Sequence, residues 1–300
     1  MRPVDLVRLP TLMAMASGRR EVVVGLLDGP VVVSHSDLNS SHIRVLTNGG
    51  ERGRCARPSS VACRHGTFVA GILVARRGSL APAICPDCSL LVRPIFTESA
   101  AEDELQPSAT PEQLAAAIAE CVDAGARMLN LSAAMGMPST RAEQQLRDAL
   151  DYAMNHNVLV VAAAGNQGTL GSSVITRHPW VIPVVGYSLD ERPMAASNLS
   201  SSMGRRGLGA PGEGIISLAS TGEPLSLAGT SFAAAFVTGT AALLWSQFPD
   251  VTAGEVRHAL VHSGQQRRTT VTPPLLDAWR AYQMLSATQV GRVAICARSS

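Results

Sequence analysis

The 300-residue sequence has few charged and few aromatic side chains, and it lacks a long uninterrupted apolar run. Charged residues make up 16% and aromatic residues 4%, against 46% hydrophobic residues, and the formal net charge is +2. So small a charge offers no basic surface for nucleic acid, since the Arg205-Arg206 and Arg267-Arg268 pairs are isolated. No stretch reaches the roughly 18 apolar residues that a membrane span needs. We therefore expect neither a nucleic-acid partner nor a membrane anchor, and predict one compact α/β domain.

The amino terminus also lacks the pattern of a secretion signal. Such a signal combines a charged segment, a continuous apolar run and a small-residue cleavage site, but Arg2, Asp5, Arg8 and Pro10 interrupt this segment. We therefore expect a cytoplasmic protein.

Six cysteines leave several bonding states open. Cys55, Cys63, Cys85 and Cys88 together offer the ligands of a zinc site, although the first pair is spaced more widely than usual zinc ligands. Local disulfides are a second alternative. We favour unbonded thiols, because thiols stay reduced in the cytosol.

Short β-branched runs alternate with helical patterns from about residue 20 to residue 265. Three helix starts are marked by Thr110, Thr140 and Thr252, each followed three residues later by Glu or Gln, as in a capping box. This alternation predicts a mostly parallel sheet with helices on both faces, and ligands then gather at the carboxyl ends of the strands. The predicted strands are 22–27, 90–92, 128–131, 158–161, 181–185 and 215–216.

We expect three parts along the chain. Residues 1–20 form an N-terminal extension, residues 21–270 form the main domain, and residues 271–300 form a C-terminal appendage packed on the same domain. Residues 275–300 are compatible with one helix and one strand.

Ser231 stands in a Gly-Thr-Ser sequence before a long apolar helix rich in alanine. The amino-terminal end of a helix carries unpaired N–H groups and a positive dipole, which stabilise negative charge. Serine and threonine are also common helix caps, so this motif alone favours a cap over a nucleophile.

Polar residues also mark three other element boundaries. Asp28 follows the first predicted strand, His65 opens an apolar helix, and Asn166 follows the strand that ends near residue 164. Each alone is explained as a turn or helix-start residue. Together with Ser231 they stand in the order Asp, His, Ser, which is the order found in subtilisin.

The sequences around these residues resemble the four signature blocks of subtilisin-like serine proteases, over about residues 20–265. The blocks here read VGLLDG, RHGTFVAGI, AAAGNQG and AGTSFAAA. The resemblance implies a three-layer α/β subtilisin-like fold and a serine endopeptidase that hydrolyses peptide bonds.

The residue types fit the chemistry of acyl transfer. His65 takes the proton from Ser231 as the serine attacks a carbonyl, and Asp28 orients the imidazole and stabilises its cation. The Asn166 amide and the Ser231 backbone N–H then bind the oxyanion. This chemistry requires no cofactor and no metal.

The same resemblance implies two walls of a substrate cleft. Ser132, Ala133 and Ala134 match the edge segment that pairs with an extended peptide, and Ala164 and Gly165 match the opposite wall of the first specificity pocket. An unpaired edge supplies main-chain hydrogen bonds to a peptide without selecting its sequence.

Several departures resemble the subgroup that matures cyanobactins and related ribosomally made peptides. These are Gly29 and Pro30 after the aspartate, the Cys85 to Cys88 segment, and Phe232 after the nucleophile. Members of that subgroup remove leader or follower segments, and some close the released core into a ring.

The short interval before His65 favours hydrolysis over ring closure. Ring-closing members carry a helical insertion that shields the acyl-enzyme from water, whereas only 36 residues separate Asp28 from His65. We therefore predict leader removal from a precursor peptide. A broad-specificity subtilase, a macrocyclase and a catalytically silent precursor-binding scaffold are the alternatives, and the oligomeric state stays open.

Two predicted loops differ in the ligands and charges that they carry. The segment 77–88 offers few oxygen ligands, so we expect no calcium there. The acidic stretch from Glu98 to Glu104 is interpreted as a solvated loop, with a preference for basic precursor residues as the alternative.

Overall fold

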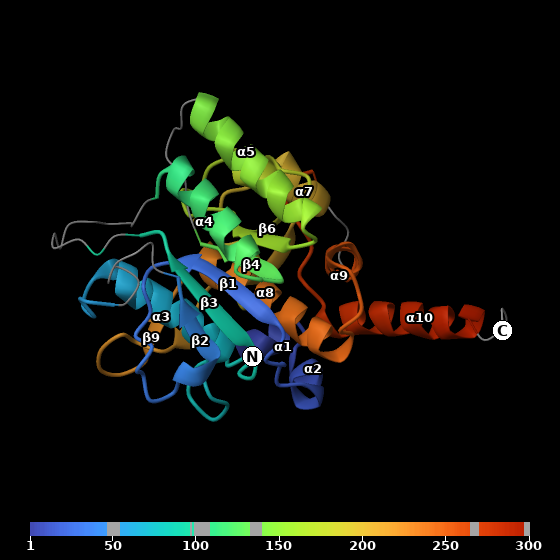
Figure 1. The fold of residues 1–300 in the computed structure, drawn as a ribbon, viewed down its shortest axis with the longest axis horizontal. Helices are drawn as coiled ribbons and strands as arrows, with labels where there is room; N and C mark the ends of the chain where they lie inside the picture. The colour runs from blue at the N-terminus through green and yellow to red at the C-terminus, as the bar shows by residue number, and fades with distance from the viewer. Residues whose placement is uncertain (47–54, 97, 99–108, 133–139, 265–269, 297–300) are drawn as a thin grey trace.

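The structure is a computed structural model that describes residues 1–46, 55–96, 98, 109–132, 140–264 and 270–296. Its main sheet has seven strands, all parallel, in the order β2-β3-β1-β4-β5-β6-β7 (Figure 1). The strands are β1 (Val23–Asp28), β2 (Ile43–Val45), β3 (Ser89–Pro94), β4 (Met128–Leu131), β5 (Leu159–Ala163), β6 (Ile182–Tyr187) and β7 (Leu208–Pro211).

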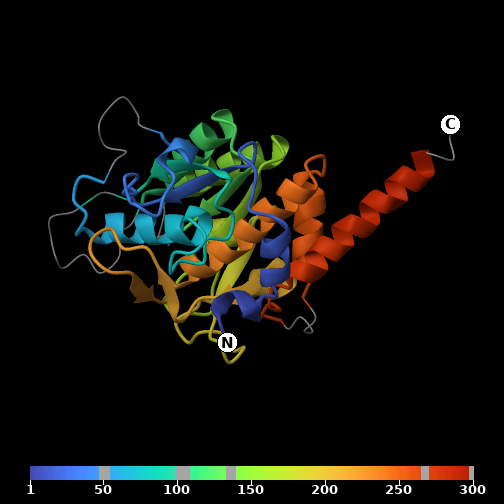
Figure 2. The same cartoon turned by 90° about the horizontal axis from the view of Figure 1, so that it is seen from below.

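Helices cover both faces of this sheet, which gives three layers. Alternate residues of β1 separate the two cores: Val24 and Leu26 lie in one cluster, and Leu27 lies in the other. The first cluster is covered by α3 (Val61–Val74) and α8 (Thr230–Gln247), as Figure 2 shows, and the second by α4 (Pro111–Asp123) and α5 (Thr140–Asn155). The predicted three-layer α/β fold is confirmed.

Capping explains where two of the predicted helices begin. Thr110 and Thr252 each accept a hydrogen bond from the backbone N–H three residues later, and Gln113 and Glu255 bond back to the cap. Helix α9 (Ala253–Val261) follows the second box, whereas α5 starts at the predicted cap position, Thr140, itself.

Residues 215–216 are strand residues, but they do not belong to the main sheet. They lie in β8 (Ile215–Ser217), which pairs antiparallel with β9 (Leu225–Leu227). The remaining short elements are α1 (Pro3–Leu6), α2 (Pro10–Met15), η1 (Ser40–His42), α6 (Val174–Arg177) and α7 (Ser201–Arg206).

The described C-terminal residues form one long helix, α10 (Ala278–Cys296). Among the described residues, the strand expected in 275–300 is reduced to an isolated parallel bridge between Leu275 and Gly209. Ala281 and Leu285 are buried, whereas Val290 is 68% exposed, and the helix extends away from the body of the molecule (Figure 1). The three-part division of the chain remains a prediction.

Strand β1 sits between β3 and β4, so the order of the sheet changes direction on either side of it. Such a switch point leaves a crevice at the carboxyl ends of the strands, where open α/β sheets bind ligands. Asp28 is the last residue of β1 and therefore lies at this crevice.

Candidate active site

Asp28 and His65 form a hydrogen-bonded pair at the switch point. Asp28 is fully buried, and its Oδ1 lies 2.6 Å from Nδ1 of His65. The same oxygen accepts the backbone N–H of Gly29 at 2.6 Å. Because Nδ1 is engaged by the carboxylate, Nε2 of His65 is left as the proton acceptor.

His65 lies deeper in its helix than predicted. Helix α3 begins at Val61, and Ser60 caps it by accepting the N–H of Cys63. His65 is therefore the fifth helical residue and does not open the helix. The first turn of α3, from Val61, was not predicted because a Ser cap followed by small residues gives little apolar periodicity.

Two glycines allow α3 to approach the end of β1. A side chain at Gly29 would overlap the carbonyl oxygen of Ala62, and one at Gly66 would overlap that of Gly29. The two backbones therefore touch without side chains between them. This contact fixes the distance between the last residue of β1 and His65.

Opposing effects act on the pKa of His65. Burial lowers this pKa, but the negative charge of Asp28 and its hydrogen bond outweigh burial and raise it above the ordinary value of 6.5. The pair thus favours the protonated imidazole that forms when a base accepts a proton.

Ser231 is the second residue of α8 and is almost buried, at 5% exposure. Its Oγ donates a long hydrogen bond of 3.4 Å to the carbonyl oxygen of Ser132. Within the described residues no hydrogen bond joins Ser231 to His65. In active sites without substrate such bonds are often long and tighten in the substrate complex.

Asn166 and the first turn of α8 are joined by a hydrogen bond. Asn166 Oδ1 accepts the backbone N–H of Thr230 at 2.9 Å, which leaves the amide NH₂ group free to donate. A Cβ atom at Gly229 would lie 3.5 Å from that nitrogen. The backbone N–H of Ser231 likewise has no acceptor among the described residues.

The loop that carries Asn166 is held by further polar contacts. Gly165 has φ of +101°, which favours glycine, and its N–H donates to Thr230 Oγ1 at 3.1 Å. Asn198 Oδ1 accepts the N–H groups of Gln167 and Thr169 at 3.1 Å each. Neither Thr230 nor Asn198 was identified from the sequence.

The predicted substrate-binding residues are only partly described. Ser132 directly follows β4 and Ala164 directly follows the neighbouring β5. Both are buried, and Ala164 donates its N–H to the carbonyl oxygen of Val184. Ala133 and Ala134 lie outside the described residues.

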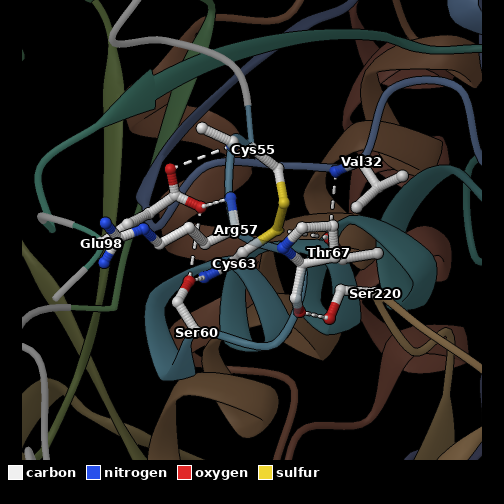
Figure 3. Close-up of a disulfide and its surroundings, with 10 residues drawn as sticks. Val32, Cys55, Arg57, Ser60, Cys63, Thr67, Glu98 and Ser220 are labelled. Atoms are coloured by element: carbon white, nitrogen blue, oxygen red, sulfur yellow. Dashed lines mark hydrogen bonds between the residues drawn. A yellow bond between two sulfur atoms is a disulfide. The ribbon is translucent and has the colours of Figure 1, made fainter. Parts of the chain in front are cut away.

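The cysteines differ from the expectation of free thiols. Cys55 and Cys63 form a disulfide (Figure 3), whereas Cys85, Cys88 and Cys121 are buried free thiols. Unbonded thiols were thus the wrong interpretation for the first pair, because the short loop between them brings their Cα atoms to 5.6 Å.

The described residues do not assemble the four-cysteine zinc site either. A cluster of possible ligands consists of Cys55, Cys63 and Glu98. The two sulfur atoms are bonded to each other, and both oxygens of Glu98 accept hydrogen bonds. Cys85 and Cys88 belong instead to the core beneath α3 and α8.

Glu98 is not the solvated residue that its acidic surroundings suggested. Its carboxylate accepts the backbone N–H groups of Ala56 at 3.0 Å and Arg57 at 2.8 Å, and Ser60 Oγ lies 3.4 Å away (Figure 3). Glu98 therefore stabilises the loop that the disulfide closes. Residues 99–104, the rest of the acidic stretch, lie outside the described residues.

Comparison with known proteins gives consistent results. A profile of the subtilase family, peptidase S8, matches residues 19–278. Mycosin-1 of Mycobacterium tuberculosis is 31% identical over an alignment of 250 positions that covers 65% of this chain and 54% of mycosin-1. The chain thus spans about half the length of that relative.

Two solved structures are similar over nearly their whole length. A mutant of the protease domain of PatA, a patellamide maturation protease, has a TM-score of 0.81 and 30% identity, covering 92% of this chain and 99% of that one. The prenylagaramide maturation protease PagA has a TM-score of 0.79 and 26% identity, with coverage of 92% and 98%. No described helix is both long and apolar enough to span a membrane. The family match over most of the chain shows that this protein belongs to the subtilase family and is a serine endopeptidase.

Proposed function

We propose that Ser231, His65 and Asp28 are the catalytic triad of this endopeptidase. The observation that carries the proposal is the 2.6 Å contact between the fully buried Asp28 and His65 Nδ1, at the site where the sequence pattern expects it. His65 Nε2 accepts the proton of Ser231 Oγ as that oxygen attacks the peptide carbonyl, and it then donates the proton to the leaving amine. Water hydrolyses the acyl-enzyme in the second half of the cycle.

Asn166 and the backbone of Ser231 supply the oxyanion hole in this proposal. The backbone N–H of Thr230 donates to Oδ1 of Asn166, so the NH₂ group of Asn166 faces away from that bond. The Ser231 N–H stands at the positive end of α8, where negative charge is stabilised. Neither donor needs to reorganise when the oxyanion forms, which is the condition for large electrostatic stabilisation.

We propose that the substrate is a ribosomally made precursor peptide and that the outcome is hydrolysis. PatA and PagA, both named maturation proteases, support the substrate class. Between Asp28 and His65 the described residues contain only η1, β2 and the start of α3, so a long helical insertion is absent from the described part of this interval. Ser132, Ala133, Ala134, Ala164 and Gly165 form the peptide-binding walls in this proposal.

Cleavage assays test this substrate class. We expect the purified chain to cut leader-bearing precursor peptides at one bond and to leave casein nearly intact, with no cutting by Ser231→Ala. Mass spectrometry of the products separates the hydrolysed core from a cyclic core, which is lighter by one water. Vigorous digestion of casein would instead indicate a broad-specificity subtilase.

We propose a cytoplasmic location. The Cys55–Cys63 disulfide argues against this location, because disulfides persist mainly in oxidising compartments. Trapping thiols with an alkylating reagent in intact cells decides the matter. A cytoplasmic chain carries alkylated Cys55 and Cys63, whereas a chain outside the cytoplasm keeps the bond.

A further inference from the structure

Two phenylalanine rings flank the imidazole of His65. The Phe232 ring lies with its centroid 5.4 Å from that of His65 and with the planes inclined by 32°. The Phe96 ring lies 6.4 Å away and stands nearly perpendicular, at 85°. His65 is therefore covered by a ring on one face and approached by a second ring, while Asp28 holds its Nδ1.

The Phe232 ring is itself held in place. It is 3% exposed and packs against Phe68, with ring centroids 4.5 Å apart. Phe68 is fully buried and lies three residues after His65 on α3, so both side chains project from the same face of that helix. Phe232 directly follows Ser231 on α8. The three rings thus join the helix of the base to the helix of the nucleophile.

We propose that Phe232 is a positioning residue that holds the His65 imidazole in line with Ser231. The hydrogen bond to Asp28 fixes one ring nitrogen but leaves the ring free to tilt about that bond. Packing against a rigid neighbouring ring removes this freedom, because close-packed aromatic rings adopt few relative orientations. The inference rests on the proposed triad.

The same ring assists when His65 becomes charged. A cation within about 6 Å of an aromatic centroid is attracted by the negative face of the ring. Phe232 also keeps water from that face of His65. Among the described residues, Asp28 is the charged side chain that acts on His65. The attraction of the Phe232 ring therefore adds to the stabilisation that the Asp28–His65 pair gives to the imidazole cation.

Phe232→Ala and Phe232→Leu test the proposal, because leucine restores bulk without an aromatic face. The matched control is Phe248→Ala, which removes a partly buried ring that packs on Tyr282. Phe248 caps the carboxyl end of α8, 16 positions after Phe232, which is a distance of about 24 Å at the helical rise. Circular dichroism of each variant confirms that the fold is retained.

The first readout is inactivation by a fluorophosphonate. We expect Phe232→Ala to lower the maximal inactivation rate about tenfold, from the energy of one aromatic pair, with little change in the inhibitor concentration at half-maximal rate. Phe232→Leu, which restores bulk but not the aromatic pair, recovers only part of the rate, and Phe248→Ala matches the natural sequence. Equal rates for Phe232→Ala and the natural sequence would overturn the proposal, as would an equal loss in Phe248→Ala.

The second readout does not depend on activity. In a Ser231→Ala background, the His65 ring is followed by NMR as a function of pH. Removal of Phe232 frees the imidazole to tilt about its bond to Asp28, so we expect broader His65 ring signals in Phe232→Ala than in the parent that keeps Phe232. Unchanged ring signals would refute positioning even where labelling of the natural sequence succeeds. If the natural sequence takes no label, the proposed triad fails, and these NMR signals still report on the ring contact separately.

Discussion

The two sides of the candidate active site are held by different kinds of interaction. On the histidine side, backbone contacts through Gly29 and Gly66, the Cys55–Cys63 disulfide and the Glu98 carboxylate fix the start of α3. On the serine side, hydrogen bonds join the loop of Asn166 to Thr230. The comparison indicates that close backbone packing and a disulfide support the base in addition to hydrogen bonds, whereas a polar network positions the oxyanion donors.

The largest expected effect comes from breaking the ion pair on the histidine side. Asp28→Asn keeps the shape but removes the charge and promotes the wrong imidazole tautomer, so we expect kcat to fall by about 10⁴-fold, as for the equivalent change in a serine protease. Steady-state kinetics on a cleaved precursor peptide measure it. Asp37→Asn, on a partly exposed turn, is the control and should leave kcat unchanged.

Removing the amide on the serine side should cost less. Asn166→Ala is expected to lower kcat by about 100- to 1,000-fold, the range measured for an oxyanion-hole asparagine of a subtilisin, with a small change in KM. The same steady-state assay measures kcat and KM of Asn166→Ala. A decrease in kcat of less than threefold would mean that Asn166 acts only in holding the loop.

Opening the disulfide separates covalent support from polar support. Because the bond closes a loop with a sequence separation of 8, the Cys55→Ser/Cys63→Ser variant should lose about 2–3 kcal/mol in free energy of unfolding. Denaturant titration measures this loss. Dithiothreitol should destabilise the natural chain by a similar amount and leave the double variant unaffected. An unfolding free energy that changes neither in the double variant nor on addition of dithiothreitol would contradict a structural role for the bond.

The mildest test is the pH dependence. Because His65 must be neutral to accept a proton and Asp28 raises its pKa, kcat/KM should fall as pH drops through a value above 6.5, and Asp28→Asn should move that limb to lower pH. The same raised pKa stabilises the fold fully below the unfolded value near 6.5, and this contribution disappears as pH rises through the folded pKa. An acid limb at or below 6.5 in the natural chain would speak against the ion pair.

Local patterns explain why much of the fold could be predicted. Strands such as β5 (Leu159–Ala163) are fully buried apolar runs, and Thr110 and Thr252 mark the starts of their helices through capping boxes. The strand β2 was missed because it is a half-buried edge strand with Arg44 at its centre, and β7 was missed because Gly209 and Pro211 interrupt its apolar pattern.

The residues of the site also differ in whether the local sequence reveals them. Asp28, Asn166 and Ser231 stand at or near element boundaries, and they and His65 lie inside recognisable local sequences. All four could therefore be identified as candidates without a structure. Glu98 and the partners of Cys55 and Cys63 could not, because they depend on contacts between segments about forty residues apart and on a pairing that sequence alone leaves open. The contact of Gly29 with α3 is of the same long-range kind.

Covalent labelling by a fluorophosphonate tests the central claim most directly. The proposed triad predicts one label per chain, located on Ser231 by peptide mass spectrometry, absent from Ser231→Ala and strongly slowed in His65→Ala. A folded natural chain that takes no label, or a label that persists in Ser231→Ala, would contradict the assignment of Ser231 as the nucleophile.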